Sequence, residues 1–255
     1  MNYVEIAKDS RLKCLELIFK AGTSHIGSNF SIIDILVVLF EKIDTSKDEA
    51  VLSAGWKAAA WYYFLWKKGI ITGEELNSFC RPNSPFIGLV EPMNRWGMRF
   101  AGGSMGMGLS AGVALAWSKK QRGQDGRVYV IESDGGMQVG INYEAISFAK
   151  QHKLDNLTLI VDYNGLQAMG ATKDILDMSN LRDELLSFGW ATMEIDGHDF
   201  EQIEFALNQK TDEPFAVIAN TIKGKGVSFM EGENLYHYKQ LSVEEYEEAK
   251  KELYG

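Results

Sequence analysis

Two polar residues stand just after two apolar runs that have the composition of buried strands. Asp134 follows the run 127–132, and Asn164 follows the run 157–162, thirty positions further along the chain. Because the carboxyl ends of parallel strands meet at one edge of a sheet, we expect the two side chains to lie side by side. Carboxylate and amide oxygens are ligands that Mg²⁺ prefers in proteins, so this spacing predicts a metal site.

The main chain beside Asp134 also suits a phosphate group. Gly135 and Gly136 follow it, so a ligand can approach the backbone closely. The next predicted helix turns its N-terminus toward the same place, where partial positive charge favours an anion. The alternative is that Asp134 only caps a helix and that Asn164 forms a turn with Gly165. Joint placement at two strand ends favours the binding site.

Periodic patterns indicate the elements that would position these residues. Helical periodicity covers 3–20, 31–43, 56–68, 108–121, 141–153, 201–209 and 242–253. Short β-rich runs cover 50–53, 127–132, 157–162, 190–195 and 215–220. Capping boxes are predicted at Ser31 with Asp34 and at Ser242 with Glu245. The alternation predicts an α/β fold with a doubly wound, mostly parallel sheet flanked by helices. The segment 80–103 holds three of the four prolines and is predicted to be a long, functional loop.

Composition limits the class of protein. The chain has 255 residues, 45% of them hydrophobic, which is enough for one domain spanning 1–255. The net charge of -9 argues against nucleic acid and anionic membranes as partners, because both would repel the chain. Cys14 and Cys80 are far apart, as is typical of reduced thiols. Since no apolar run suits a membrane span or a signal peptide, we expect a cytoplasmic protein.

Several segments together resemble the transketolase family. One is the stretch 134–167, in which Asp-Gly is followed some thirty residues later by Asn, as in the thiamine-diphosphate fingerprint. The other segments are 22–36, 102–118, 195–203 and 220–232. The chain is most similar to the split form, in which the N-terminal half is a separate chain. This resemblance implies the thiamine-diphosphate-binding fold, in the version that holds the diphosphate (the PP-type domain).

The resemblance implies a cofactor and a metal. The cofactor would be thiamine diphosphate and the metal Mg²⁺, with Ca²⁺ or Mn²⁺ able to take its place. The metal ligands would be the side chains of Asp134 and Asn164 and the backbone carbonyl of Leu166. The main chain at Gly135 and Gly136 would face the diphosphate.

Other site residues are implied in the same way. Against the cofactor's rings would lie Gly103, Ser104 and Met105. His25 would face the substrate, and His237 would reach toward the diphosphate and the substrate. His198, by contrast, would be structural, and His152 shows no motif and would mark a solvated helix end.

The resemblance also implies a partner chain. In this family a glutamate from a pyrimidine-binding domain activates the cofactor's aminopyrimidine. The sequence ends at Gly255 after one domain, so we expect this glutamate from a C-terminal transketolase-like subunit. Two chains of each kind would form an α2β2 heterotetramer. Trp61, Tyr62 and Trp66 could belong to that interface or to the core.

Four positions depart from the family pattern. Trp56 and Leu89 stand where histidines that face the substrate are usual, Arg99 replaces a glutamate, and Val139 replaces the glutamate that helps couple two active sites. Loss of imidazoles removes partners for sugar hydroxyls and adds apolar area. We therefore expect transfer of a two-carbon ketol or acyl unit from a ketose or 2-oxo acid donor to a less hydroxylated acceptor. For Leu89 the alternative is a local misalignment within 80–103.

Two further functions stay open at this point. The same losses would fit a catalytically degenerate scaffold or a regulatory chain, although the retained Asp134, Asn164 and His25 argue against it. An NAD(P)-dependent dehydrogenase would share the fold class. The glycine-rich stretch 103–108 is a weak motif for it, because no strand clearly leads into that stretch.

Overall fold

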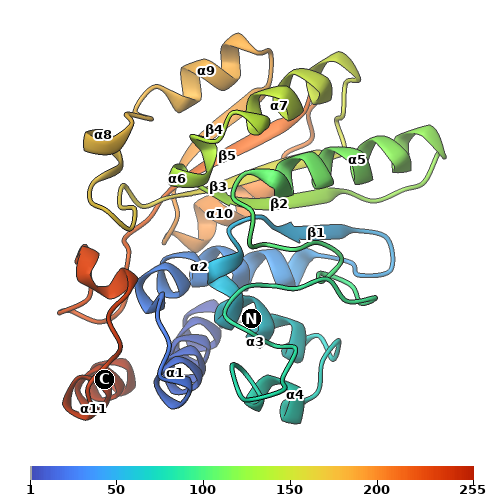
Figure 1. Cartoon of the computed structure of the whole chain (residues 1–255). Helices are drawn as coiled ribbons and strands as arrows, with labels where there is room; N and C mark the ends of the chain where they lie inside the picture. Colours follow the sequence, from blue (N-terminus) through green and yellow to red (C-terminus); the bar gives the residue numbers. More distant parts are fainter. Residues whose placement is uncertain (1) are drawn as a thin grey trace.

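The computed structural model describes residues 2–255 and is built around one parallel sheet (Figure 1). Within these residues the sheet has five strands in the order β1-β2-β3-β5-β4, and every neighbouring pair is parallel. The strands are β1 (Glu49–Leu52), β2 (Val128–Ser133), β3 (Leu157–Tyr163), β4 (Ala191–Asp196) and β5 (Phe215–Asn220). The predicted doubly wound α/β fold is confirmed.

The central strands are apolar because helices cover both of their faces. Every residue of β2 is buried, and so is β3 from Leu157 to Asp162. Such strands read as continuous apolar runs, as parallel sheets require. The edge strand β4 is only partly buried: within it Ile195 is buried and its two neighbours are exposed. The register pairs Ser133 of β2 with Asp162 of β3, so both strands deliver polar residues to the same edge.

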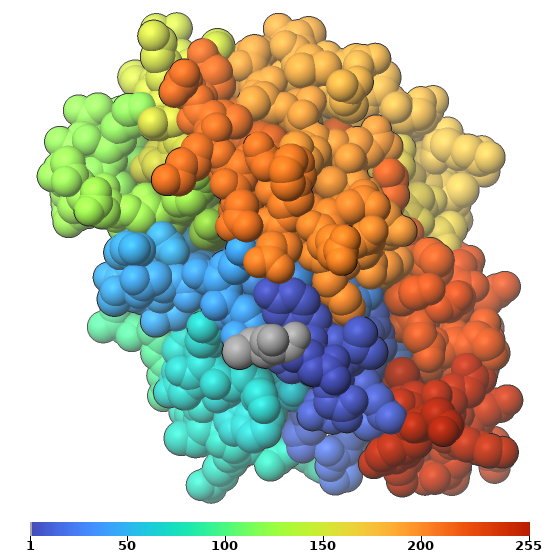
Figure 2. All heavy atoms as spheres, turned by 180° about the vertical axis from the view of Figure 1, so that it is seen from behind, coloured from blue at the N-terminus to red at the C-terminus, as the bar shows by residue number. Residues whose placement is uncertain are grey.

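Helices form two layers, one on each face of the sheet (Figure 1). The first layer contains α1 (Tyr3–Ala21), α2 (Ile26–Lys42), α3 (Ala58–Lys67), α10 (Phe200–Leu207) and α11 (Val243–Tyr254). The second contains α5 (Met107–Gln121), α7 (Ile141–Gln151) and α9 (Leu181–Ser187). Short elements are η1 (Gly55–Lys57), α4 (Gly73–Asn77), α6 (Asp134–Met137), α8 (Thr172–Ile175) and η2 (Asn234–His237). Figure 2 shows the first layer from behind, with the N-terminal α1 packed beside the C-terminal α11.

The predicted start of the second helix is wrong. The helix begins at Ile26, and Ser31 lies inside it rather than at its cap. The Ser31 hydroxyl donates to the Ser28 carbonyl and to the Asp162 carboxylate, and Asp34 pairs with Arg11. Because α2 is buried on nearly all sides, its apolar residues show no clear stripe that marks its first turn. The capping box at Ser242 is confirmed.

Several other expectations are settled by burial. Trp61 and Tyr62 are core residues, and Trp66 is partly buried against the same cluster. His198 is structural, since its ring contacts Asp34 Oδ2 and accepts from the Ile222 amide. His152 ends α7 and is exposed.

The predicted long loop is confirmed between α4 and α5. Among residues 2–255 no helix combines the length and apolar character needed to cross a membrane.

Candidate active site

A cavity of ≈ 200 Å³ opens at the carboxyl edge of β2 and β3. It is bounded by the loops after these strands, by the start of α2, by η1 and by η2. Its lining comprises His25, Ser28, Trp56, Lys57, Met105, Ser133, Asp134, Gly135, Asn164, Leu166, Gln167, Ala168, His237 and Tyr238. The chain therefore brings together segments that are more than two hundred residues apart in sequence.

Asp134 begins α6 and is 1% exposed. Its Oδ2 accepts hydrogen bonds of 2.8 Å from the Gly165 amide and from Thr172 Oγ1, and its Oδ1 accepts one from the Gly135 amide. Burial raises the pKa of this carboxyl, although these hydrogen bonds oppose the shift. A buried carboxylate of this kind is stabilised by a bound cation.

Asn164 and Leu166 lie on the loop that follows β3. The Asn164 Nδ2 group donates to Asp162 Oδ2 at 3.3 Å, and its Oδ1 accepts from the Leu166 amide at 3.1 Å. The Leu166 carbonyl accepts from Lys223 Nζ at 3.3 Å. Asp134, Asn164 and Leu166 thus line one cavity, which is the proximity that the strand ends predict.

The loop around Gly135 fits an anionic group. A Cβ added at Gly135 would lie 3.1 Å from Gln167 Cγ, so the space between them would be lost to any larger residue. Gln167 Nε2 is buried and has no hydrogen-bond partner among the described residues. Buried donors of this kind are normally paired, so Gln167 Nε2 is free to bind an oxygen of a ligand.

A second glycine is required for a different reason. A Cβ added at Gly136 would lie 1.9 Å from Glu132 Oε1, a buried carboxyl that also accepts from the Ser53 hydroxyl. Gly136 therefore accommodates this carboxyl behind the cavity, whereas Gly135 keeps the cavity itself open.

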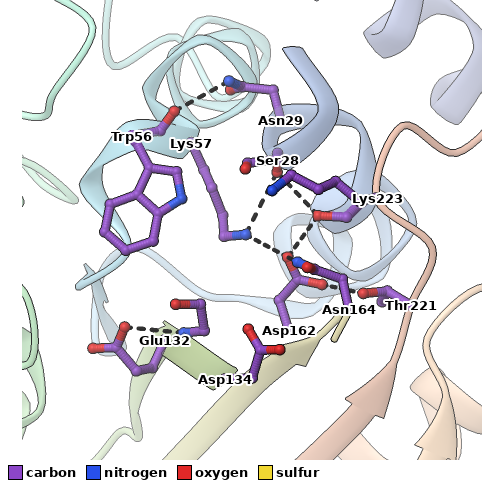
Figure 3. A network of polar contacts seen from close by, with 12 residues as sticks. Ser28, Asn29, Trp56, Lys57, Glu132, Asp134, Asp162, Asn164, Thr221 and Lys223 are labelled. Carbon is purple, nitrogen blue, oxygen red and sulfur yellow. Dashed lines mark hydrogen bonds and ion pairs between the residues drawn. The ribbon is translucent and has the colours of Figure 1, made fainter. Parts of the chain in front are cut away.

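Two buried lysines lie beside the cavity, and neither was among the site residues predicted from the sequence. Lys57 is 0% exposed and forms an ion pair with Asp162 (Figure 3). Lys223 is 1% exposed, and its Nζ lies 2.7 Å from His237 Nδ1. Burial, and then the charge of Lys57, lowers the pKa of Lys223 to about 8. The charge of Lys57 is balanced by Asp162, whereas Lys223 Nζ contacts the Leu166 carbonyl and His237 Nδ1, so its charge can balance that of an anionic ligand. The signal for Lys57 in the sequence is a lone lysine within an apolar helix start.

The two predicted histidines lie against each other in the lining of the cavity. The His25 amide donates to the His237 carbonyl at 2.9 Å, and the ring centroids are 4.9 Å apart in a T-shaped arrangement. Burial, followed by the charge of Lys223, lowers the pKa of His25 to about 4 and that of His237 to about 3. Both rings are therefore neutral at neutral pH, when each can donate one hydrogen bond and accept another. His25 also has a φ of 72°, a strained conformation that suits a functional position.

Three residues were predicted to lie against the cofactor's rings, and one of them lines the cavity. Met105 is part of the lining, whereas Gly103 and Ser104 are exposed and lie outside it. The glycine-rich stretch 103–108 leads into α5 from the long loop, so it does not form the strand-turn-helix arrangement of a dinucleotide site.

The four departures from the family pattern lie in different surroundings. Trp56 lines the cavity together with Lys57, and Figure 3 shows its indole beside the Lys57 side chain. Leu89 lies beside Gly103, where an added Cβ would be 3.6 Å from Leu89 Cδ1. Arg99 pairs with Glu49 of β1 at 3.0 Å, outside the cavity lining. Val139 packs so closely on Gly106 that a Cβ there would lie 2.7 Å from it.

Comparison with known proteins identifies the family. The family described as transketolase, thiamine diphosphate binding domain, matches residues 3–255. The chain belongs to the transketolase family. It is 33% identical to one of the subunits of the apulose-4-phosphate transketolase of Phocaeicola vulgatus, over 97% of this chain and 92% of that protein. It is 34% identical to the 6-deoxy-6-sulfo-D-fructose transketolase subunit SqwG of a Clostridium species, over 94% of this chain and 91% of that one.

Solved transketolases share the fold. The structure from Campylobacter jejuni superposes with a TM-score of 0.92 at 29% identity, and it covers 99% of this chain. The chain spans 43% of the length of that transketolase. The cavity at the carboxyl edge of β2 and β3 thus belongs to a transketolase-type, thiamine-diphosphate-binding domain.

Proposed function

We propose that this chain, as one domain spanning 1–255, is the diphosphate-binding subunit of a two-chain, thiamine-diphosphate-dependent transketolase-like enzyme. The observation that carries the proposal is the convergence of Asp134, Asn164 and the Leu166 carbonyl on a cavity that also holds Lys57. Mg²⁺ suits these oxygens, and Ca²⁺ or Mn²⁺ could replace it.

The chain's own residues would bind and orient the cofactor. When bound, thiamine diphosphate supplies a nucleophilic carbon and an electron sink for the group that is transferred. Gly135 and Gln167 would bind the diphosphate oxygens, and Lys223 would balance their charge. The neutral rings of His25 and His237 would hold a substrate hydroxyl or carbonyl by hydrogen bonds, since each neutral ring has one donor and one acceptor nitrogen.

A partner chain is part of this proposal. The activating glutamate would come from a C-terminal transketolase-like subunit in an α2β2 assembly, and the relatives that are themselves named as transketolase subunits support a multi-chain enzyme. An apolar patch on α5 and α7 also supports it. Trp117 and Phe148, 39% and 41% exposed, lie on this patch with ring centroids 6.1 Å apart. At the start of α5, Met107 is 37% exposed and stands two residues after Met105 of the cavity lining. Cytoplasmic location belongs to the same proposal, with both cysteines free.

The acceptor would be less hydroxylated than an ordinary aldose phosphate. Trp56 presents an apolar ring in the cavity where the family pattern has an imidazole, and a two-carbon ketol or acyl unit would come from a ketose or 2-oxo acid. We expect the purified complex to show little turnover of xylulose 5-phosphate with ribose 5-phosphate. The screen should then compare acceptors that lack hydroxyls. Robust turnover of the ordinary pair would contradict the specialised acceptor without affecting cofactor binding.

A catalytically degenerate scaffold is the second candidate, favoured by Trp56 and Val139. It predicts a complex that forms but shows no saturable binding of thiamine diphosphate. Gln167 Nε2, which is buried without a partner among the described residues, argues against it, because a ligand oxygen would satisfy this donor. The buried Asp134 carboxyl argues against it too, because a bound cation would stabilise its charged form.

A further inference from the structure

Lys57 occupies an unusual position for a lysine. It ends η1, is 0% exposed, and pairs with Asp162 at the end of β3, which is also 0% exposed. Its Nζ also lies 3.5 Å from the Ser28 carbonyl. Trp56 and Lys57 are adjacent, so the chain has a buried cation next to the position where the family pattern has a histidine.

Stability alone does not account for this ion pair. Removing a lysine and an aspartate from water is costly, and apolar residues of similar volume often stabilise a fold as well or better. A buried pair on a cavity wall is therefore better explained by what it holds in place. Asp162 accepts from the Ser31 hydroxyl, the Thr221 hydroxyl and Lys57, and the fourth donor is Asn164 Nδ2 at 3.3 Å (Figure 3).

The contact with Asn164 decides which way its amide faces. An amide can present either oxygen or nitrogen, and only the oxygen can bind a cation. Asp162 Oδ2 lies opposite the Asn164 amide as an acceptor, and together with the Leu166 amide on the other side it selects the orientation in which Nδ2 faces Asp162. Asn164 Oδ1 then turns toward the Leu166 amide on the cavity side.

We propose that Lys57 is a positioning residue for the metal, because it holds the Asp162 carboxylate in place and thereby keeps the Asn164 oxygen turned into the site. This inference rests on the proposed function and deepens it. The direct alternative is that Lys57 binds the diphosphate itself. The two differ in whether the effect of Lys57 passes through Asp162.

The test is a double-mutant cycle on the chain in complex with its partner. Calorimetry measures the apparent affinity for Mg²⁺ at saturating thiamine diphosphate, and for thiamine diphosphate at saturating Mg²⁺. Lys57→Met is expected to weaken Mg²⁺ binding by about 10–100-fold, as loss of an outer partner of a metal ligand does. In an Asp162→Asn background the same change is expected to cost less than about threefold, since coupled residues are not additive. Lys120→Met, which breaks a surface pair with Asp155, is the matched control and should change neither affinity.

Each outcome separates the alternatives. Wild-type protein that binds no cofactor contradicts the proposed function itself. If wild type binds, unchanged Mg²⁺ affinity in folded Lys57→Met overturns the positioning role. An equal loss in both backgrounds overturns it too, in favour of direct contact with the diphosphate. Should Lys57→Met fail to fold, Lys57→Gln is measured with the same expectation, because the shorter, neutral side chain loses the ion pair with Asp162 but keeps a polar group at the buried position.

Discussion

At the scale of single residues, Asp134 tests the metal site most simply. Asn at this position keeps the shape and one acceptor oxygen, but it removes the charge that would bind Mg²⁺. We expect Asp134→Asn to lower Mg²⁺-dependent binding of thiamine diphosphate by more than about 100-fold, beyond the loss typical of outer partners. Calorimetry of the complex measures the binding, and circular dichroism checks the fold. Binding that survives in Asp134→Asn would contradict its role as a ligand.

The low pKa values of His25 and His237 make a prediction about pH. Both are depressed below the usual histidine value, so between about pH 6.5 and 4 the unfolded chain takes up protons that the folded chain does not. The free energy of unfolding should therefore fall as the pH falls through this window. Urea unfolding at pH 7 and pH 5 should show a smaller fall in the double variant His25→Gln, His237→Gln. A fall of the same size in that variant would refute the depressed pKa values.

The sequence predicts some of these residues and not others for a physical reason. Asp134 and Asn164 follow recognisable strands, and parallel strands bring their ends together. Lys57 and Lys223 approach the same place from η1 and from the loop after β5, and their positions depend on how α2, α3 and the sheet pack. No local pattern records that packing, so Lys223 could not be assigned in advance, and the signal for Lys57 is limited to its place as a lone lysine in an apolar helix start.

At the scale of elements, long periodic segments are predicted well and short ones are not. The helices α1, α5, α7 and α11 and all five strands are found close to their expected bounds. The helices α4, α6, α8 and α9 are too short for a periodic pattern. The start of α2 at Ile26 is missed because His25 caps it in a left-handed conformation without a side-chain hydrogen bond, which leaves no capping signature.

The packing of α5 on β2 makes an element-scale prediction. Helix propensity favours Gly112→Ala by about 1 kcal/mol. A Cβ at Gly112, however, would lie 2.1 Å from Val130 Cγ2 of β2, so the helix must move away from the sheet. Overpacking should win, with a net loss of about 1–3 kcal/mol in the free energy of unfolding. Gly140→Ala, which meets no described residue within 4 Å, is the control. An increase in stability for Gly112→Ala in urea unfolding would show that this contact relaxes easily.

At the scale of the whole molecule, the apolar patch on α5 and α7 makes the partner testable. Trp117→Glu should leave the chain folded, because the side chain is partly exposed, but it should prevent the partner from binding. Phe205→Glu changes a 62% exposed aromatic on α10, in the opposite helix layer, and should leave assembly intact. Analytical ultracentrifugation of each variant with the partner measures assembly. A complex that tolerates Trp117→Glu would place the interface elsewhere.

The most direct measurement is a calorimetric titration of thiamine diphosphate with Mg²⁺ into this chain, alone and in the presence of its partner. The cavity supplies the proposed metal ligands and the diphosphate-facing main chain, whereas the activating glutamate is expected from another chain. We therefore predict tight, Mg²⁺-dependent binding when the partner is present and weak or no binding without it. Absence of binding in both samples would contradict the proposal that this chain forms half of a working cofactor site.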